Sequence, residues 1–289
     1  MKIFTCNDVS PEFVELQVAS FRKYLQENFE FTVLNGGEAI GCYPEKAKEV
    51  SRICRSLSVP VIDVQRDSEI EAVRDDKFRY PGYTDGPLFG ENGRYTHGVG
   101  GHSFNYMLNW AWQRILSKER GPICFLHSDV FLMEPIKLTD YLKEHELCAI
   151  ITGKAANDKH GVLEWIWEPL LLADMPKLPN PETVVWWPTF VEGEWADTGG
   201  PTHYWLKAHP EIRLMRIGQS GCQDDPAVNF HPARYGFFHL DAEERRRAGV
   251  PAAGDKKVFH YYSGSGWCQK DPGYHKKKLA WTRKLIGVD

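Results

Sequence analysis

Short apolar runs alternate with segments of helical periodicity at the start of the chain. Apolar residues at 2–5, 29–34 and 59–64 predict three strands. Between them, apolar positions recur at helical spacing after Pro11 and after Pro44, and proline is favoured in the first turn of a helix. This alternation indicates parallel βαβ units with right-handed crossovers.

A further apolar run extends from Ile123 to Leu132, and one polar triplet, His127-Ser128-Asp129, interrupts it. The density of Ile, Cys, Phe, Leu and Val predicts a single strand that is buried on both faces. An imidazole and a carboxylate near the end of such a strand need a partner or a metal, because burying an unpaired charge is costly. The run therefore predicts that His127 and Asp129 reach a divalent cation at the carboxyl edge of the sheet.

The remaining pattern predicts a long surface excursion over 67–101 and an irregular, Trp- and Pro-rich stretch over 161–190. Apolar periodicity predicts the other elements, which are helices over 104–117, 138–144 and 201–209, strands over 147–152, 212–217 and 258–262, and a basic helix at the end of the chain. Within that last helix, the basic run 275–278 is most simply a solvated face.

Composition narrows the class of protein. The chain has 289 residues, enough for one full core, and its 35 Lys and Arg nearly balance 39 Asp and Glu. The balanced charge gives no overall positive potential that would attract nucleic acid, and no apolar run approaches the length of a transmembrane helix. Seven cysteines without a repeated CxxC spacing suit reduced thiols. We therefore expect a cytoplasmic α/β protein with no nucleic-acid partner and no transmembrane segment.

Four motifs follow one another in the chain: HSD at 127–129, DTGG at 197–200, QDDPAVN at 223–229 and HYYSGSGW at 260–267. Their order resembles the GT-A class of nucleotide-sugar glycosyltransferases, and most closely the family of glycogenin and the bacterial lipooligosaccharide galactosyltransferases. That family shows DxD after a buried strand, then N-x-G, DQDxxN and HxxGxxKPW. In this chain His127 replaces the first Asp, and the last motif has an extra residue before its glycine and lacks Lys-Pro.

The resemblance implies an α/β fold of the GT-A, Rossmann-like type, with a mixed, mostly parallel sheet flanked by helices. It implies a single domain over 1–289, with a nucleotide-binding half at 1–135 and, at 136–289, an acceptor-side half that carries the C-terminal metal and phosphate motif. It also implies a hexosyltransferase that moves a sugar, with retention, from a nucleoside-diphosphate sugar to a carbohydrate or other hydroxyl acceptor. UDP is the expected nucleotide.

The expected cation is Mn²⁺ or Mg²⁺, because a carboxylate and an imidazole with open positions suit a hard divalent ion that phosphate oxygens and water complete. Asp129 supplies an oxygen ligand, and His260 supplies a second ligand from the end of another strand. His127 either binds the cation or contacts the ribose. The other expected donor contacts come from strand ends or the last motif, and they are Asn7, Asp8, Ser128, Gly264 and Trp267.

Three aspartates are the catalytic candidates: Asp197, Asp224 and Asp225. By resemblance, Asp197 lies where the family binds the sugar, and Asp224 or Asp225 contacts the sugar or lies below the reacting carbon. The residues alone leave simpler explanations open. Asp197 can close a tight turn with the glycines that follow it, Asp224 and Asp225 can cap a helix, and His127 can be a core histidine.

Two other functions are consistent with the pattern. One keeps the fold and changes the reaction to that of a nucleotidyltransferase or a metal-dependent phosphoesterase. The other is a non-catalytic carbohydrate-binding protein that stacks sugars on tryptophan. The tryptophans of the Trp-rich region are expected to divide between the core and an acceptor platform, and they are Trp165, Trp167, Trp186, Trp187 and Trp195.

Overall fold

The computed structural model describes residues 1–7, 10–36, 44–77, 100–155, 162–221, 236–240, 257–261 and 272–288. The helices in these ranges are α1 (Pro11–Tyr24), α3 (Pro44–Ser56), α4 (Ser68–Lys77), α5 (Gly100–Arg114), α6 (Thr202–Ala208) and α9 (Pro272–Ile286), with short 3₁₀ turns at η1 (Leu116–Lys118), η2 (Leu138–Asp140), η3 (Met175–Lys177) and η4 (Pro181–Thr183). The strands are β1 (Lys2–Cys6), β2 (Glu30–Asn35), β3 (Val61–Asp63), β4 (Pro122–His127), β5 (Val130–Leu132), β6 (Leu147–Ala155), β7 (Val162–Asp174), β8 (Thr189–Val191), β9 (Glu194–Ala196), β10 (Leu214–Gly221), β11 (Gly236–His239) and β12 (Val258–His260).

One large sheet runs in the order β3-β2-β1-β4-β7-β6-β10-β11-β12-β5, and β8 and β9 form a separate hairpin. From β3 to β4 all neighbours are parallel, as are β6 and β10, whereas β7 is antiparallel to both β4 and β6. Beyond β10, the strands β11, β12 and β5 pair antiparallel. The predicted class, a mixed and mostly parallel central sheet flanked by helices, is confirmed.

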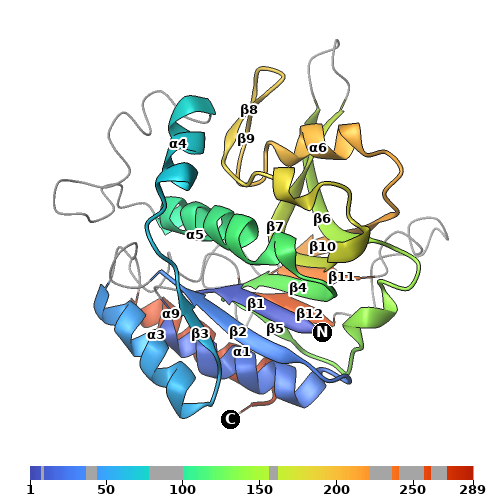
Figure 1. The fold of residues 1–289 in the computed structure, drawn as a ribbon. Helices are drawn as coiled ribbons and strands as arrows, with labels where there is room; N and C mark the ends of the chain where they lie inside the picture. The colour runs from blue at the N-terminus through green and yellow to red at the C-terminus, as the bar shows by residue number, and fades with distance from the viewer. Residues whose placement is uncertain are drawn as a thin grey trace.

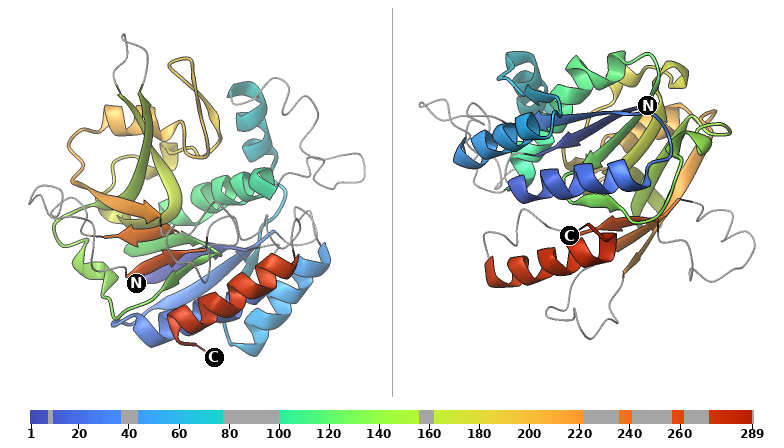
Figure 2. Two further views of the ribbon diagram at one scale, coloured as in Figure 1. Left: turned by 180° about the vertical axis from the view of Figure 1, so that it is seen from behind. Right: turned by 90° about the horizontal axis from the view of Figure 1, so that it is seen from below.

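Helices cover both faces of this sheet (Figure 1). Helices α1, α3 and α9 lie along one face, and α5 lies on the other, as the views from behind and below also show (Figure 2). Strand β4 alternates between the two cores: Cys124 and Leu126 pack with α1, whereas Ile123 and Phe125 pack with α5. All four are buried, so the prediction of a strand covered on both faces is confirmed for β4.

The run 123–132 forms two strands, and the prediction of a single strand was wrong. Strand β4 ends at His127, Ser128 and Asp129 form a turn, and β5 then pairs with β12. Gln17 of α1 is buried under this turn, where its Nε2 donates to the carbonyl oxygens of His127 at 2.7 Å and Val130 at 2.9 Å. These two bonds satisfy carbonyl groups at the strand ends and fix the turn.

Strand β7 occupies part of the stretch that was expected to be irregular. Its Trp-, Leu- and Ile-rich sequence suits a strand between two neighbours. The register against β6 shifts between Ala149 and Ile150, and residues 168–170 of β7 have no partner on β6 there. Pro169 has no N–H to give to a ladder, which favours a bulge at this point. The bulge begins at Glu168.

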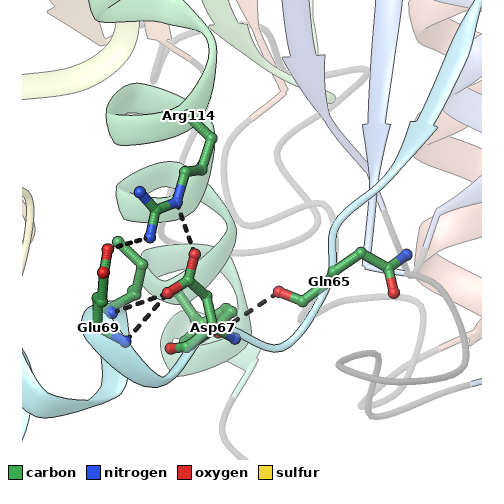
Figure 3. Close-up of polar contacts among 6 residues, drawn as sticks. Gln65, Asp67, Glu69 and Arg114 are labelled. Carbon is green, nitrogen blue, oxygen red and sulfur yellow. Dashed lines mark hydrogen bonds and ion pairs between the residues drawn. The ribbon is translucent and has the colours of Figure 1, made fainter.

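The excursion 67–101 begins with a helix that the sequence pattern did not predict, α4. Its first turn is capped by Asp67, whose Oδ1 accepts from the backbone N–H of Glu69 at 3.0 Å. The Arg114 guanidinium faces the carboxylates of Asp67 and Glu69 (Figure 3), and one of its nitrogens lies 2.6 Å from an oxygen of each. The pKa of Asp67 is lowered, chiefly by the hydrogen bond from Arg114. Among the side chains of α4 that the structure describes, only Ile70 is buried, so this helix has no apolar periodicity to detect.

In the part of the chain that the structure describes, no helix has both the length and the apolar character needed to cross a bilayer. The four described cysteines are buried and unbridged, and they are Cys6, Cys54, Cys124 and Cys148.

Two glycines beside the β8–β9 hairpin, Gly193 before β9 and Gly199 after it, differ in the space around them. Gly199 and Gly193 both have a φ of +86°, which favours glycine, but a Cβ would overlap the carbonyl oxygen of Ile166 at Gly199 and would meet nothing within 4 Å at Gly193. Gly193→Ala should cost about 1–2 kcal/mol from backbone strain alone. Gly199→Ala should cost about 3 kcal/mol or more, because the clash adds to that strain. Urea unfolding of both variants measures the difference, and equal losses would mean that the Ile166 carbonyl does not restrict position 199.

Candidate functional site

Two features of the fold bring His127, Asp129 and His260 together. The turn after β4 places Asp129 two residues beyond His127, at the carboxyl edge of the parallel strands. The antiparallel pairing of β5 with β12 sets His260 opposite Val130, and the N–H of Tyr261 donates to the carbonyl oxygen of Asp129 at 2.8 Å. Side chains that are far apart in the sequence therefore meet at one point.

The geometry of this cluster fits a single metal ion. His260 Nε2 lies 3.2 Å from Asp129 Oδ1, and His127 Nδ1 lies 4.0 Å from the same oxygen. One ligand atom from each residue lies within 4.8 Å of the others. Two ligands of one ion are separated by at most about twice a metal–ligand distance, roughly 4–5 Å. The donor set of two imidazoles and one carboxylate suits a divalent transition metal.

The cluster is mostly buried, and its most exposed member is His127. The side chains of Asp129 and His260 are 8% and 4% exposed, whereas that of His127 is 22% exposed. Burial lowers the pKa of His260, and the nearby Asp129 only partly opposes this shift. The imidazole is therefore held in its neutral form, which is the form that binds metal. Metal binding by these residues stays a prediction.

Glu168 is a site residue that the motifs did not predict. It lies in the bulge of β7, it is 3% exposed, and its Oε1 lies 3.1 Å from His127 Nε2. Burial raises the pKa of this carboxyl, while His127 opposes the rise and the charge of Asp197 adds to it. A signal was present in the sequence, since Glu168 interrupts the apolar run from Trp165 to Ala173. It was overlooked because that run was not assigned to a strand.

Asp197 lies just after β9, with its side chain exposed. Its Oδ1 accepts from the N–H of Thr198 at 2.8 Å, and its carbonyl oxygen accepts from the N–H of Gly200 at 2.9 Å. The backbone thus forms the tight turn that was one of the two explanations, and the catalytic role of Asp197 stays a prediction. Five other candidates lie outside the described residues, and they are Asp8, Asp224, Asp225, Gly264 and Trp267.

Asn7 follows β1, whose last residue pairs with His127, so it lies at the same edge of the sheet. It is buried, and its amide bonds the backbone of Ser10, donating to the carbonyl at 2.9 Å and accepting from the N–H at 3.1 Å. Ser128 is partly exposed in the turn after β4. Contact of either residue with a nucleotide stays a prediction.

The tryptophans divide between buried and partly buried positions, and an acceptor platform stays a prediction. Trp165, Trp186 and Trp187 are buried in the core. Trp167 is partly buried, and its ring centroid lies 5.8 Å from that of His260. Trp195 is partly buried beside the exposed Phe190. The buried three are unavailable to stack on a sugar, which leaves Trp167 next to the candidate metal centre and Trp195 at the surface.

Lys278 corrects the expectation that residues 275–278 form a solvated face, because Lys278 and His275 are buried. Lys278 Nζ donates to the carbonyl oxygen of Tyr261 and lies 3.9 Å from the centroid of the Tyr261 ring. Burial lowers its pKa to about 7, with Asp129 opposing the shift. The buried amine of Lys278 thus contacts Tyr261, the residue that follows His260.

No family model and no curated protein matches this sequence. Among solved structures, the chain is similar to the galactosyltransferase LgtC in complex with donor and acceptor sugar analogues, with a TM-score of 0.47 and 12% identity, covering 99% of this chain and 95% of that one. Mouse xyloside xylosyltransferase 1, in its apo form, gives a TM-score of 0.48 and 12% identity, covering 92% and 99%. The apo form of the glycosyltransferase GlyE from Streptococcus pneumoniae TIGR4 gives 0.43 and 12%, covering 99% and 64%.

All three of these solved structures are described as glycosyltransferases. At such low TM-scores and identities, the similarity carries no argument about the chemistry of this chain. That chemistry has to be inferred from the residues themselves.

The lowered pKa of Lys278 generates a prediction about pH. An unfolded lysine titrates near 10.5, and the folded one titrates at about 7, so the unfolded state binds more protons between these values. Stability should therefore rise as pH increases from 7 toward 10.5, by up to about 1.4 kcal/mol per pH unit from this group. Lys278→Met should remove that contribution.

Urea unfolding of the wild type and of Lys278→Met between pH 7 and pH 9.5 measures this effect. Lys276→Met, at an exposed position of the same helix, is the matched control and should keep the wild-type slope. If Lys278→Met also keeps the wild-type slope, the folded protein does not lower the pKa of Lys278.

Proposed function

We propose that this protein transfers a sugar from a nucleoside-diphosphate sugar, with UDP as the nucleotide, to a carbohydrate or other hydroxyl acceptor, with the help of a divalent cation. The observation that carries the proposal is the cluster of His127, Asp129 and His260 at the carboxyl ends of the parallel strands. Open α/β sheets bind their ligands at this edge. The order of the four motifs, from HSD to HYYSGSGW, gives the proposal its reaction class.

The cation would be held by Asp129 and His260, with His127 as a third ligand. When bound, it would neutralise the charge of a diphosphate leaving group. The donor set of two imidazoles and one carboxylate suits Mn²⁺ better than Mg²⁺, and it also suits Fe²⁺. A binding experiment should therefore compare these three ions.

The remaining roles are those expected from the ends of the strands and from the order of the motifs. Asn7, Asp8 and Ser128 would contact the nucleotide, as would Gly264 and Trp267 of the last motif. Asp197 would bind the transferred sugar, and Asp224 or Asp225 would lie beside the reacting carbon. We propose that residues 1–135 form the half of the domain that binds the donor and that residues 136–289 form the acceptor half. We also propose that the transfer retains the configuration at the sugar.

Two alternatives remain distinguishable by experiment. A nucleotidyltransferase or a metal-dependent phosphoesterase would use the same cation and diphosphate, but it would release different products. A non-catalytic carbohydrate-binding protein would bind sugar without regard to nucleotide or chelator. That alternative is weakened because Trp165, Trp186 and Trp187 are buried.

Asp129→Asn tests the cation directly. The wild type should bind UDP more tightly in the presence of Mn²⁺, and Asp129→Asn should lose that enhancement, because it removes the charged oxygen ligand. The loss in Mn²⁺ affinity should be at least the roughly 10–100-fold that loss of an outer-shell partner costs. Isothermal titration of Mn²⁺ measures the Mn²⁺ affinity, and titration of UDP with and without Mn²⁺ measures the enhancement.

Asp140→Asn is the matched control, since Asp140 lies in η2 on the surface, where it pairs with Lys143. This variant should bind UDP and Mn²⁺ as the wild type does. UDP binding that ignores Mn²⁺ in the wild type would overturn the cation-dependent mechanism. Product analysis with a UDP-sugar donor then separates transfer to an acceptor from simple release of phosphate.

A further inference from the structure

We propose that Glu168 is a positioning residue that accepts a hydrogen bond from His127 Nε2 and so directs His127 Nδ1 toward the cation shared with Asp129 and His260. This inference rests on the proposed metal site and adds a residue outside the three candidate ligands. It also removes the choice that the sequence left open for His127, between the cation and the ribose.

The geometry of the imidazole carries the first step. One ring nitrogen, Nε2, lies 3.1 Å from Glu168 Oε1, and the other, Nδ1, lies 4.0 Å from Asp129 Oδ1. In the cation-bound state that we propose, Glu168 is ionised and can only accept a hydrogen bond, so the proton lies on Nε2. The lone pair of Nδ1 is then left for the cation. Phe104 packs against the ring edge-on, with centroids 4.3 Å apart, and restricts its rotation.

The burial of Glu168 carries the second step. Glu168 is 3% exposed, and its Oε2 has no hydrogen-bond partner among the described residues. Leaving a carboxylate oxygen in this state costs free energy, and an apolar side chain would satisfy the same strand better. The bulge that begins at Glu168 nevertheless turns its carboxylate to His127. The contact with His127 is therefore the feature that explains a buried glutamate at this point.

A carboxylate behind a metal-binding imidazole fixes the ring and makes it a stronger donor. When ionised in the cation-bound state, Glu168 also adds a negative charge behind His127, in addition to that of Asp129. Both effects increase affinity for a divalent cation. The structure thus assigns Glu168 to the cation site without direct contact between its side chain and the metal.

Glu168→Gln and Glu168→Leu test this role, with Mn²⁺ alone as the probe. Free Mn²⁺ is measured by electron paramagnetic resonance during titration of each protein. Mn²⁺ affinity should fall about 10-fold in Glu168→Gln, which keeps an acceptor, and toward about 100-fold in Glu168→Leu, which removes it. Glu164→Gln on the same strand is the control, since Glu164 pairs with Arg216 at the surface and should leave Mn²⁺ affinity unchanged.

Two further measurements separate positioning from a general structural effect. Without metal, Glu168→Gln should unfold at the wild-type temperature or above it, because the substitution removes a buried charge. In a His127→Ala background, Glu168→Gln should cause no additional loss of Mn²⁺ affinity, because its effect passes through the imidazole.

The outcomes separate this inference from the proposed function. If the wild type binds no Mn²⁺, the cation site and this inference both fail. If the wild type binds Mn²⁺ and Glu168→Gln binds it equally well, the cation site stands and the role of Glu168 is overturned. Equal losses from Glu168→Gln with and without the His127 imidazole would likewise overturn positioning through His127.

Discussion

The cost of burying charge is the constraint on which the structure of this protein depends. Asp129 and Glu168 are both almost fully buried at the edge of a sheet that is covered by helices on its two faces. Each carboxylate lies within hydrogen-bond reach of an imidazole, since Asp129 meets His260 and Glu168 meets His127. Two buried carboxyl groups beside two imidazoles, without a cation among them, are an incomplete electrostatic unit. A divalent cation bound among them, followed by an anionic diphosphate, would complete it.

Each part of the fold contributes to holding this unit. The double-sided core around Cys124 and Phe125 makes β4 rigid up to His127. Gln17 then closes the turn from the α1 side, and the β5–β12 pairing delivers His260 from the far end of the sheet order. The bulge in β7 adds Glu168 from a fourth strand. Because the ligands come from elements that are held independently, the site depends on packing rather than on one flexible loop.

The sequence predicted the parts of the fold that depend on local pattern. Apolar runs located β1, β2, β4 and β6, and helical spacing located α1, α3 and α5. What it missed depends on pairing between distant segments. The departure of β5 toward β12 splits an apolar run that looks continuous. Strand β7 looked irregular because it is rich in Trp and contains Pro169, and its place in the sheet depends on pairing with β4 and β6. For the same reason His127, Asp129 and His260 were found as motif residues, whereas Glu168 belongs to no motif and was found only from its contact.

The most direct test of a shared cation is a crystal structure of the protein with Mn²⁺ and UDP, recorded with anomalous scattering from manganese. A shared cation predicts one manganese peak bounded by the Asp129 carboxylate, His260 and Nδ1 of His127, with diphosphate oxygens on its open side. A crystal that contains UDP but shows manganese elsewhere, or shows His127 and His260 turned away from Asp129, would contradict it.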